Sequence, residues 1–271
     1  IINNNVILYT GTSSPSSGIY IFNNEKVQIN NNIISGFIAN ISIRVVYDTA
    51  FIFNNVLTNS RNTQFPPATG GILSAANRVV VKNNILTNMT LAANVDQYAD
   101  GNYNLFWNNN YNLWDTQYGD SDIVANPMFV KDTIPASDFN FDFHLQAFSP
   151  GIDKGDPNIL DKDGTRSDIG MYGGPLGESY TYQDLAPRPP TGLSASVDTI
   201  ITIRWKKNSE SDISHYKLYR DTVINFIADP TKLIATPADS FYTHIPPSGN
   251  HKYYYKLTAV DNQENESELS L

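Results

Sequence analysis

The sequence lacks several features on which protein function often depends. None of its 271 residues is cysteine, which excludes disulfide scaffolds, thiolate zinc sites and cysteine nucleophiles. Only 17% of the residues are charged, and no apolar run approaches the ~18 residues of a membrane span. Acids outnumber bases by 27 to 18, so we expect no binding to nucleic acid through phosphate neutralisation. The length allows one large domain or two ordinary domains with their own cores.

The surplus of acids is confined to the middle of the chain. Residues 111–186 carry a formal charge of −9, whereas residues 1–110 carry +1 and residues 187–271 carry −1. Asparagine is also unevenly spread, because 26 of the 32 asparagines precede residue 141. The chain therefore divides into an asparagine-rich part, an acidic part and a nearly neutral C-terminal part.

The asparagine-rich part contains a repeat, in which an asparagine pair precedes two aliphatic residues. Four copies occupy residues 4–7, 31–34, 54–57 and 83–86, with a looser fifth at 103–106. They are 27, 23, 29 and 20 residues apart, and short alternating strands lie between them. This period predicts one coil of a parallel β-helix per repeat. We expect each pair at the same sharp turn, with its amides stacked in a ladder and the apolar residues pointing inward.

The acidic part continues this pattern with an ordered series of motifs at residues 126–130, 142–146, 149–156 and 161–170. The repeats resemble those of right-handed parallel β-helix proteins of the pectin-lyase-like superfamily. The series resembles the C-terminal end of secreted bacterial β-helix proteins, including those of choice-of-anchor organisation. The resemblance implies a β-helix over residues 1–180, but one fold hosts many functions.

A proline-rich stretch at residues 181–190 predicts a stiff linker. Behind it, alternating strands are predicted at 192–197, 200–205, 216–220, 232–235 and 253–260, a spacing typical of a small antiparallel sandwich. Residues 190–193, Trp205, 214–220 and 252–261 resemble the strands of a fibronectin type III domain. The predicted fold is therefore an all-β chain, a β-helix followed by a fibronectin type III-like domain over residues 191–271.

The acidic part also contains a candidate calcium site. Asp161, Asp163 and Asp168 surround a glycine turn, and Thr165 offers a carbonyl, so several hard oxygens fall within eight residues. The motif resembles the first half of an EF-hand-like loop without its terminal glutamate. A bound Ca²⁺ would be structural. The alternative is that these aspartates cap turns through their own hydrogen bonds, with Arg166 as counter-ion.

Candidate catalytic residues are few. The resemblance to β-helix polysaccharide lyases implies a basic residue in a groove along one sheet, and Arg44, Arg78 and Lys82 are available, with Tyr47 and Asp48 near the first. The alternative is that all three bases are solvated surface groups. The motifs of polygalacturonase-like hydrolases are absent from the sequence. His144 stands inside a fold motif, which predicts a structural role.

An aromatic run follows the repeats, and two interpretations of it remain open. Exposed rings suit the flat apolar faces of sugars, whereas buried rings would fill the end of the solenoid. Its members are Tyr98, Tyr103, Phe106, Trp107, Tyr111, Trp114 and Tyr118.

We expect a secreted or cell-surface bacterial protein with a structural, adhesive or carbohydrate-binding role. Ile1 stands directly in a repeat, so we also expect further coils upstream in a longer protein. Polysaccharides and other cell-surface or secretion proteins are the expected partners. The alternatives are a polysaccharide lyase or glycoside hydrolase, and a subunit of an extracellular assembly or a substrate of type IX secretion.

Overall fold

The computed structural model describes residues 1–8, 17–22, 26–36, 41–46, 49–59, 71–75, 78–95, 100–113, 117, 119–132, 140–245 and 251–270. They form two compact units, Ile1–Gln183 and Asp184–Leu271, and nearly all regular structure is β-strand. A 3-10 helix, η1 (Pro230–Lys232), is the only helical element within those ranges. The described part of the chain contains no helix that is both long and apolar enough to cross a membrane. An all-β chain with parallel sheets is thereby confirmed.

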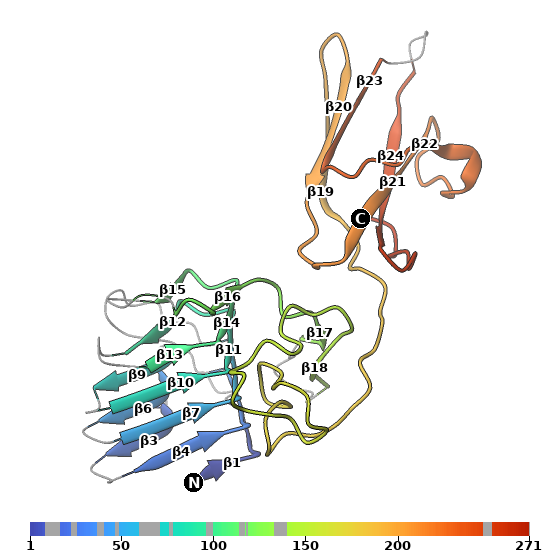
Figure 1. Ribbon diagram of the computed structural model, residues 1–271. Coiled ribbons are helices and arrows are strands. Elements are labelled where there is room, and N and C mark those ends of the chain that lie inside the picture. Colours follow the sequence, from blue (N-terminus) through green and yellow to red (C-terminus); the bar gives the residue numbers. More distant parts are fainter. Residues whose placement is uncertain are drawn as a thin grey trace. The chain divides into compact units, whose positions relative to one another are not determined.

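The first unit contains three parallel sheets that each gain one strand per repeat, as a solenoid does (Figure 1). Sheet A consists of β1 (Ile2–Asn3), β4 (Val27–Asn30), β7 (Thr49–Phe53), β10 (Arg78–Lys82) and β13 (Asp100–Asn102). Sheet B consists of β2 (Val6–Leu8), β5 (Ile33–Ser35), β8 (Val56–Thr58), β11 (Ile85–Thr87), β14 (Leu105–Trp107) and β16 (Ile123–Val124). Sheet C consists of β3 (Ser17–Phe22), β6 (Ile41–Val46), β9 (Ile72–Ala75), β12 (Leu91–Asn94) and β15 (Tyr111–Leu113).

A two-residue turn joins sheet A to sheet B in every coil. Its first residue has a left-handed backbone, which asparagine tolerates better than most residues. The φ values are 55° at Asn4, 53° at Asn31, 53° at Asn54, 59° at Asn83 and 59° at Tyr103. The second residues form the predicted amide ladder, in which each of the first four donates its Nδ2 to Oδ1 of the next at 2.9–3.0 Å. In order, the ladder residues are Asn5, Asn32, Asn55, Asn84 and Asn104. The ladder is confirmed for one residue of each pair.

The two aliphatic residues that follow each turn lie on opposite faces of sheet B. Ile34, Leu57 and their equivalents pack in the solenoid core with residues of sheets A and C. Ile33, Val56 and their equivalents pack in a second core with Phe143 of β18 (Asp142–Leu145). The expectation that alternating apolar residues point inward therefore holds for the second of each two, whereas the first lies on the outer face. Successive residues of a strand alternate between faces, and here both faces are covered.

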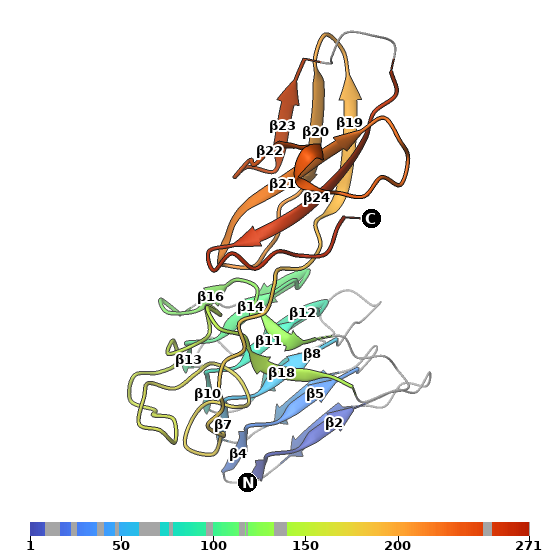
Figure 2. The ribbon, with the colours of Figure 1, turned by 90° about the vertical axis from the view of Figure 1, so that its right-hand side faces the viewer.

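The outer face of sheet B is covered by the acidic part of the chain. β17 (Phe129–Lys131) pairs with β18 in an antiparallel ribbon, which Figure 2 shows beside the strands of sheet B. Residues 149–174, the closing segment, follow the corner between sheets A and B. Asn31 donates its Nδ2 to the carbonyls of Met171 and Gly173 at 2.6 and 2.7 Å, and Asn54 donates to that of Asp168 at 2.9 Å. Asn31 and Asn54, the first asparagines of their pairs, thus bind this segment.

The second unit consists of two antiparallel sheets that share one core. One has the order β19 (Thr191–Val197), β20 (Ile201–Lys206) and β23 (Phe241–His244); the other has β22 (Leu233–Ala235), β21 (Ile213–Asp221) and β24 (Tyr254–Asp261). Trp205 and Tyr216, one from each sheet, pack edge to face with ring centroids 5.2 Å apart. The sequence did not predict β23, because four residues carry too short an alternation to be recognised.

Candidate functional site

The three predicted catalytic bases do not converge. Arg44 lies on β6 in sheet C, whereas Arg78 and Lys82 begin and end β10 in sheet A. Arg44 and Arg78 are exposed, and Lys82 is half-buried. Tyr47 and Asp48, which stand near Arg44 in sequence, lie outside the described residues. General acid–base chemistry needs positioned groups around one reacting atom, and this placement provides none.

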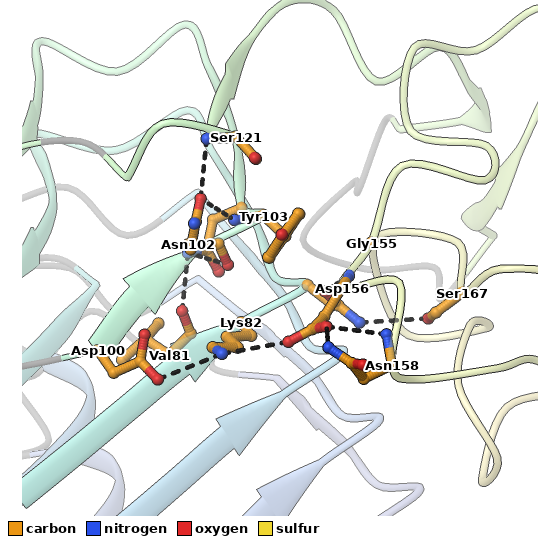
Figure 3. Close-up of polar contacts among 12 residues, drawn as sticks. Val81, Lys82, Asp100, Asn102, Tyr103, Ser121, Gly155, Asp156, Asn158 and Ser167 are labelled. Carbon is orange, nitrogen blue, oxygen red and sulfur yellow. Dashed lines mark hydrogen bonds and ion pairs between the residues drawn. The ribbon is translucent and has the colours of Figure 1, made fainter.

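Lys82 is engaged in two ion pairs (Figure 3). Its Nζ lies 3.2 Å from Oδ2 of Asp100 in the next coil and 3.1 Å from Oδ2 of Asp156 in the closing segment. Burial lowers the pKa of Lys82, but hydrogen bonds and charge from Asp156 and Asp100 outweigh it and raise that pKa. Lys82 is therefore held protonated, which suits a structural cation and opposes the role of a general base.

The partner Asp156 is itself fixed by neighbours. Its Oδ1 accepts from the backbone N–H and the side-chain amide of Asn158, at 3.0 and 2.9 Å. Its own N–H donates to Oδ1 of Asn83, at 2.7 Å. Asn83 is the first residue of a repeat pair, so the repeat positions both partners of the Lys82 ion pair.

The four predicted calcium ligands take part in separate hydrogen bonds. Asp161 accepts the N–H groups of Asp168 and Gly174, at 3.0 and 2.5 Å. Asp163 accepts the N–H and the hydroxyl of Thr165, at 3.0 and 2.7 Å, which is a local turn motif. The carboxylates of Asp161 and Asp163 therefore stabilise the backbone of the closing segment.

Asp168 is the most deeply buried of the four, and it faces Tyr182. Its Oδ1 accepts the N–H of Asp153 at 3.0 Å, and its Oδ2 accepts the Tyr182 hydroxyl at 2.9 Å. Burial raises the pKa of Asp168 to about 6, with a further contribution from the charges of Asp161 and Asp153. Within the described ranges, no three acidic or histidine side chains lie together in a way that could hold a metal ion. The geometry fits the turn-capping alternative, and the calcium site stays a prediction.

The aromatic run does not form one platform among the described residues. Phe106 is buried in the solenoid core, Trp107 packs on the outer core of sheet B, and Tyr103 is half-buried. Among the members of the run that the structure describes, only Tyr111 is exposed, at 46%. Tyr98, Trp114 and Tyr118 lie outside the described residues. Phe106 and Trp107 fit the interpretation that the rings fill the solenoid, and the sugar-stacking interpretation stays a prediction.

A different pair of aromatic rings is exposed on the outer face of sheet C. Tyr20 and Phe22 of β3 are 54% and 50% exposed, with ring centroids 6.4 Å apart and an angle of 26° between the rings. Arg44, the register partner of Tyr20 on β6, places its guanidinium carbon 5.4 Å from the Tyr20 ring centre. We call Tyr20, Phe22 and Arg44 the sheet C platform. Sequence reasoning missed the platform, although Ile19 and Ile21 alternate with the two rings and so predict outward-facing aromatics.

No family model matches this chain, and no curated protein matches it. Solved structures match about a third of it. A Fn3-like protein from Clostridium thermocellum is 31% identical, with 32% of this chain and 88% of that chain covered and a TM-score of 0.27. A beta-1,2-glucanase from Parabacteroides distasonis is 25% identical over 38% of this chain and 14% of that chain, with a TM-score of 0.26. The 6th fibronectin type III domain from human fibronectin type III domain containing protein 3 is 18% identical, with 34% of this chain and 87% of that chain covered and a TM-score of 0.25.

Proposed function

We propose that this chain belongs to a secreted or cell-surface bacterial protein that binds carbohydrate. Its first part, residues 1–180, would be a right-handed parallel β-helix of pectin-lyase-like type, and residues 191–271 a fibronectin type III-like sandwich beyond a linker at 181–190. Three parallel sheets that each gain a strand per repeat support the first assignment. Two antiparallel sheets around one core support the second.

The observation that carries the binding proposal is the sheet C platform. The two large rings are half exposed and adjoin each other on the outer face of a parallel sheet, and contiguous exposed apolar side chains are typical of interaction sites. A sugar ring presents C–H groups that stack on aromatic faces, and its hydroxyls accept hydrogen bonds from a guanidinium. Arg44 lies beside Tyr20 and supplies such donors.

A glycan array probed with the whole chain tests this proposal, followed by calorimetry with the glycans that bind. We expect Tyr20→Ala and Phe22→Ala each to weaken binding at least tenfold. Phe148→Ala is the matched control, since Phe148 is also 50% exposed in the same unit. Equal losses in all three variants, or no glycan bound by the wild type, would refute the proposal. Ultraviolet absorbance of unsaturated products, followed in the same samples, tests the lyase alternative.

A further inference from the structure

The first asparagine of each repeat pair places a side-chain amide at the same position along the solenoid corner. Asn31 donates two hydrogen bonds from one Nδ2, both to carbonyl oxygens of the closing segment. Asn54 contacts the carbonyls of Asp168 and Gly170 and the hydroxyl of Ser167, at 2.9, 3.3 and 3.1 Å. In each of these coils, the amide binds a set of neighbouring oxygen acceptors.

Asn4 occupies the equivalent position one coil earlier, but the surroundings of its side chain differ. It has the same left-handed backbone, with φ of 55°, and its N–H donates to the carbonyl of Asn30. Its side chain is exposed, and no residue among those described supplies it with the carbonyls that Asn31 receives. Instead Asn4 lines a pocket of about 280 Å³, which also includes Lys162, Met171, Tyr172, Leu176 and Glu178.

The walls of this pocket are held in place. The turn from Tyr172 to Glu178 is closed by a hydrogen bond from the Glu178 N–H to the Tyr172 carbonyl, at 3.0 Å. Gly177 is required inside the turn, because an added Cβ would lie 1.9 Å from that carbonyl oxygen. The His144 ring stacks on Tyr172 with centroids 3.6 Å apart, and its Nε2 lies 2.7 Å from Oε1 of Glu178.

The lining combines apolar area with groups that bind hydroxyls. Met171, Leu176 and the Tyr172 ring offer apolar contact, while Asn4 and Lys162 donate and Glu178 accepts hydrogen bonds. Burial raises the pKa of Tyr172 to about 12, so its hydroxyl stays protonated and also donates. Apolar walls with a few convergent polar groups are typical of small-molecule sites, and this volume lies just below their usual range.

We propose that this pocket binds a single sugar ring, with two neighbouring hydroxyl oxygens in the place that carbonyl oxygens take at Asn31. The Asn4 amide would donate to both, Tyr172 and Leu176 would contact the C–H groups of the ring, and Lys162 and Glu178 would bind the remaining hydroxyls. The site is separate from the sheet C platform and adds a second saccharide position on the first unit. A pocket of about 280 Å³ has room for one sugar ring.

Saturation-transfer NMR and calorimetry on the whole chain test the pocket, with glucose, galactose, N-acetylglucosamine and glucuronate as probes. At least one probe should bind, and Asn4→Ala and Lys162→Ala should each weaken it at least fivefold. Both residues are exposed, so neither variant should unfold the protein. Lys154→Ala is the matched control, an exposed lysine of the same segment that does not line the pocket, and should bind normally.

Two further measurements separate this site from the sheet C platform. Tyr20→Ala and Phe22→Ala should leave binding of the single sugar unchanged, whatever they do to longer glycans. The pocket proposal is overturned if none of the four sugars binds, or if Asn4→Ala and Lys162→Ala bind as well as the wild type. It is also overturned if the sugars do not bind while triglycine does, and if Asn4→Ala and Lys162→Ala weaken the binding of triglycine. The occupant would then be a peptide.

Discussion

Asn104 donates both its backbone N–H and its side-chain amide to Oδ1 of Asp122, at 2.7 and 3.2 Å. This contact ends the asparagine ladder. Each residue of the ladder from Asn32 to Asn104 accepts from one coil and donates to the next, which an amide does and a carboxylate cannot. Asp122, at the end of the ladder, only accepts hydrogen bonds. Its Oδ2 also accepts the N–H of Gly119, at 2.8 Å. Burial raises the pKa of Asp122, although the hydrogen bonds from Asn104 and Gly119 lower it.

Asp122→Ala should lower the free energy of unfolding by about 2 kcal/mol, because the donors of Asn104 lose their acceptor. Asp122→Asn keeps that acceptor and loses only the bond from Gly119, so its effect should be about half as large. Urea unfolding followed by circular dichroism measures both. Equal effects of the two variants would show that the ladder does not depend on this acceptor.

Asn55 occupies the middle of the ladder and is fully buried. Its Nδ2 donates to Asn84 Oδ1 and to the carbonyls of Ile29 and Phe53. Asn55→Ala should cost about 3 kcal/mol, since it removes these bonds and leaves buried partners unsatisfied. Asn5→Ala is the control: Asn5 is exposed and donates to Asn32, and its loss should cost less than about 1 kcal/mol. Similar losses at both positions in the same urea titrations would contradict a role for burial.

The asparagine repeat predicted the turns and the ladder, because the left-handed backbone and the amide are properties of asparagine itself. The sequence does not predict which asparagine of a pair joins the ladder and which binds the closing segment, since Asn31 and Asn32 are residues of the same type. The outer face of sheet B, on which Ile33 lies, is covered by β18, which lies over a hundred residues later. The local alternation of residues predicts the strands, whereas contacts between residues distant in sequence determine which segment covers each face of a sheet.

Lys82→Met should lower the free energy of unfolding by about 1 to 2 kcal/mol, because Asp100 and Asp156 both lose their counter-ion. The loss should shrink in high salt, which already screens the partly exposed pair with Asp100. Arg78→Met, on the same strand but exposed, should change stability by less than about 0.5 kcal/mol. Thermal melts at low and high salt compare the two. A larger effect of Arg78→Met would contradict the assignment of Lys82 as the structural cation.

Asp168→Asn should stabilise the protein at pH 7 by about 1 to 3 kcal/mol, because it removes a buried charge whose pKa is raised to about 6. The folded state holds this proton more tightly than the unfolded chain does. The wild type therefore loses stability as pH rises from about 4 to about 6, and the advantage of the variant should grow over that window and then level off. Urea unfolding at pH 4, 5, 6 and 7 measures it. A constant difference between the two proteins would exclude titration of Asp168 as the cause.

The same variant decides the calcium prediction. With hydrogen bonds alone at Asp161 and Asp168, a chelator should leave the melting temperature unchanged, and Asp168→Asn should melt higher with or without Ca²⁺. A calcium site would give the reverse, a wild type stabilised by Ca²⁺ and a variant that melts lower and ignores it. Melting curves with Ca²⁺ and with EDTA separate the two results.

The candidate sites show where sequence reasoning stops. Arg44, Arg78 and Lys82 could be grouped from the sequence only by their charge, and only the strand register places Arg44 beside Tyr20 and Lys82 beside Asp100. The alternation of Ile19 and Ile21 with the rings of Tyr20 and Phe22 can be recognised in the sequence. This local pattern does not show whether a second layer covers the face on which the rings lie. The pocket at Asn4 depends on a segment more than 150 residues away.

The sheet C platform is tested most directly by hydroxyl-radical footprinting, with and without the glycan that binds most tightly on the array. Oxidation of Tyr20 and Phe22 should fall severalfold when the glycan is bound, because the sugar rings cover both side chains. Oxidation of Phe148 should not change. Unchanged oxidation of Tyr20 and Phe22 under saturating glycan would contradict the proposal that this face binds carbohydrate.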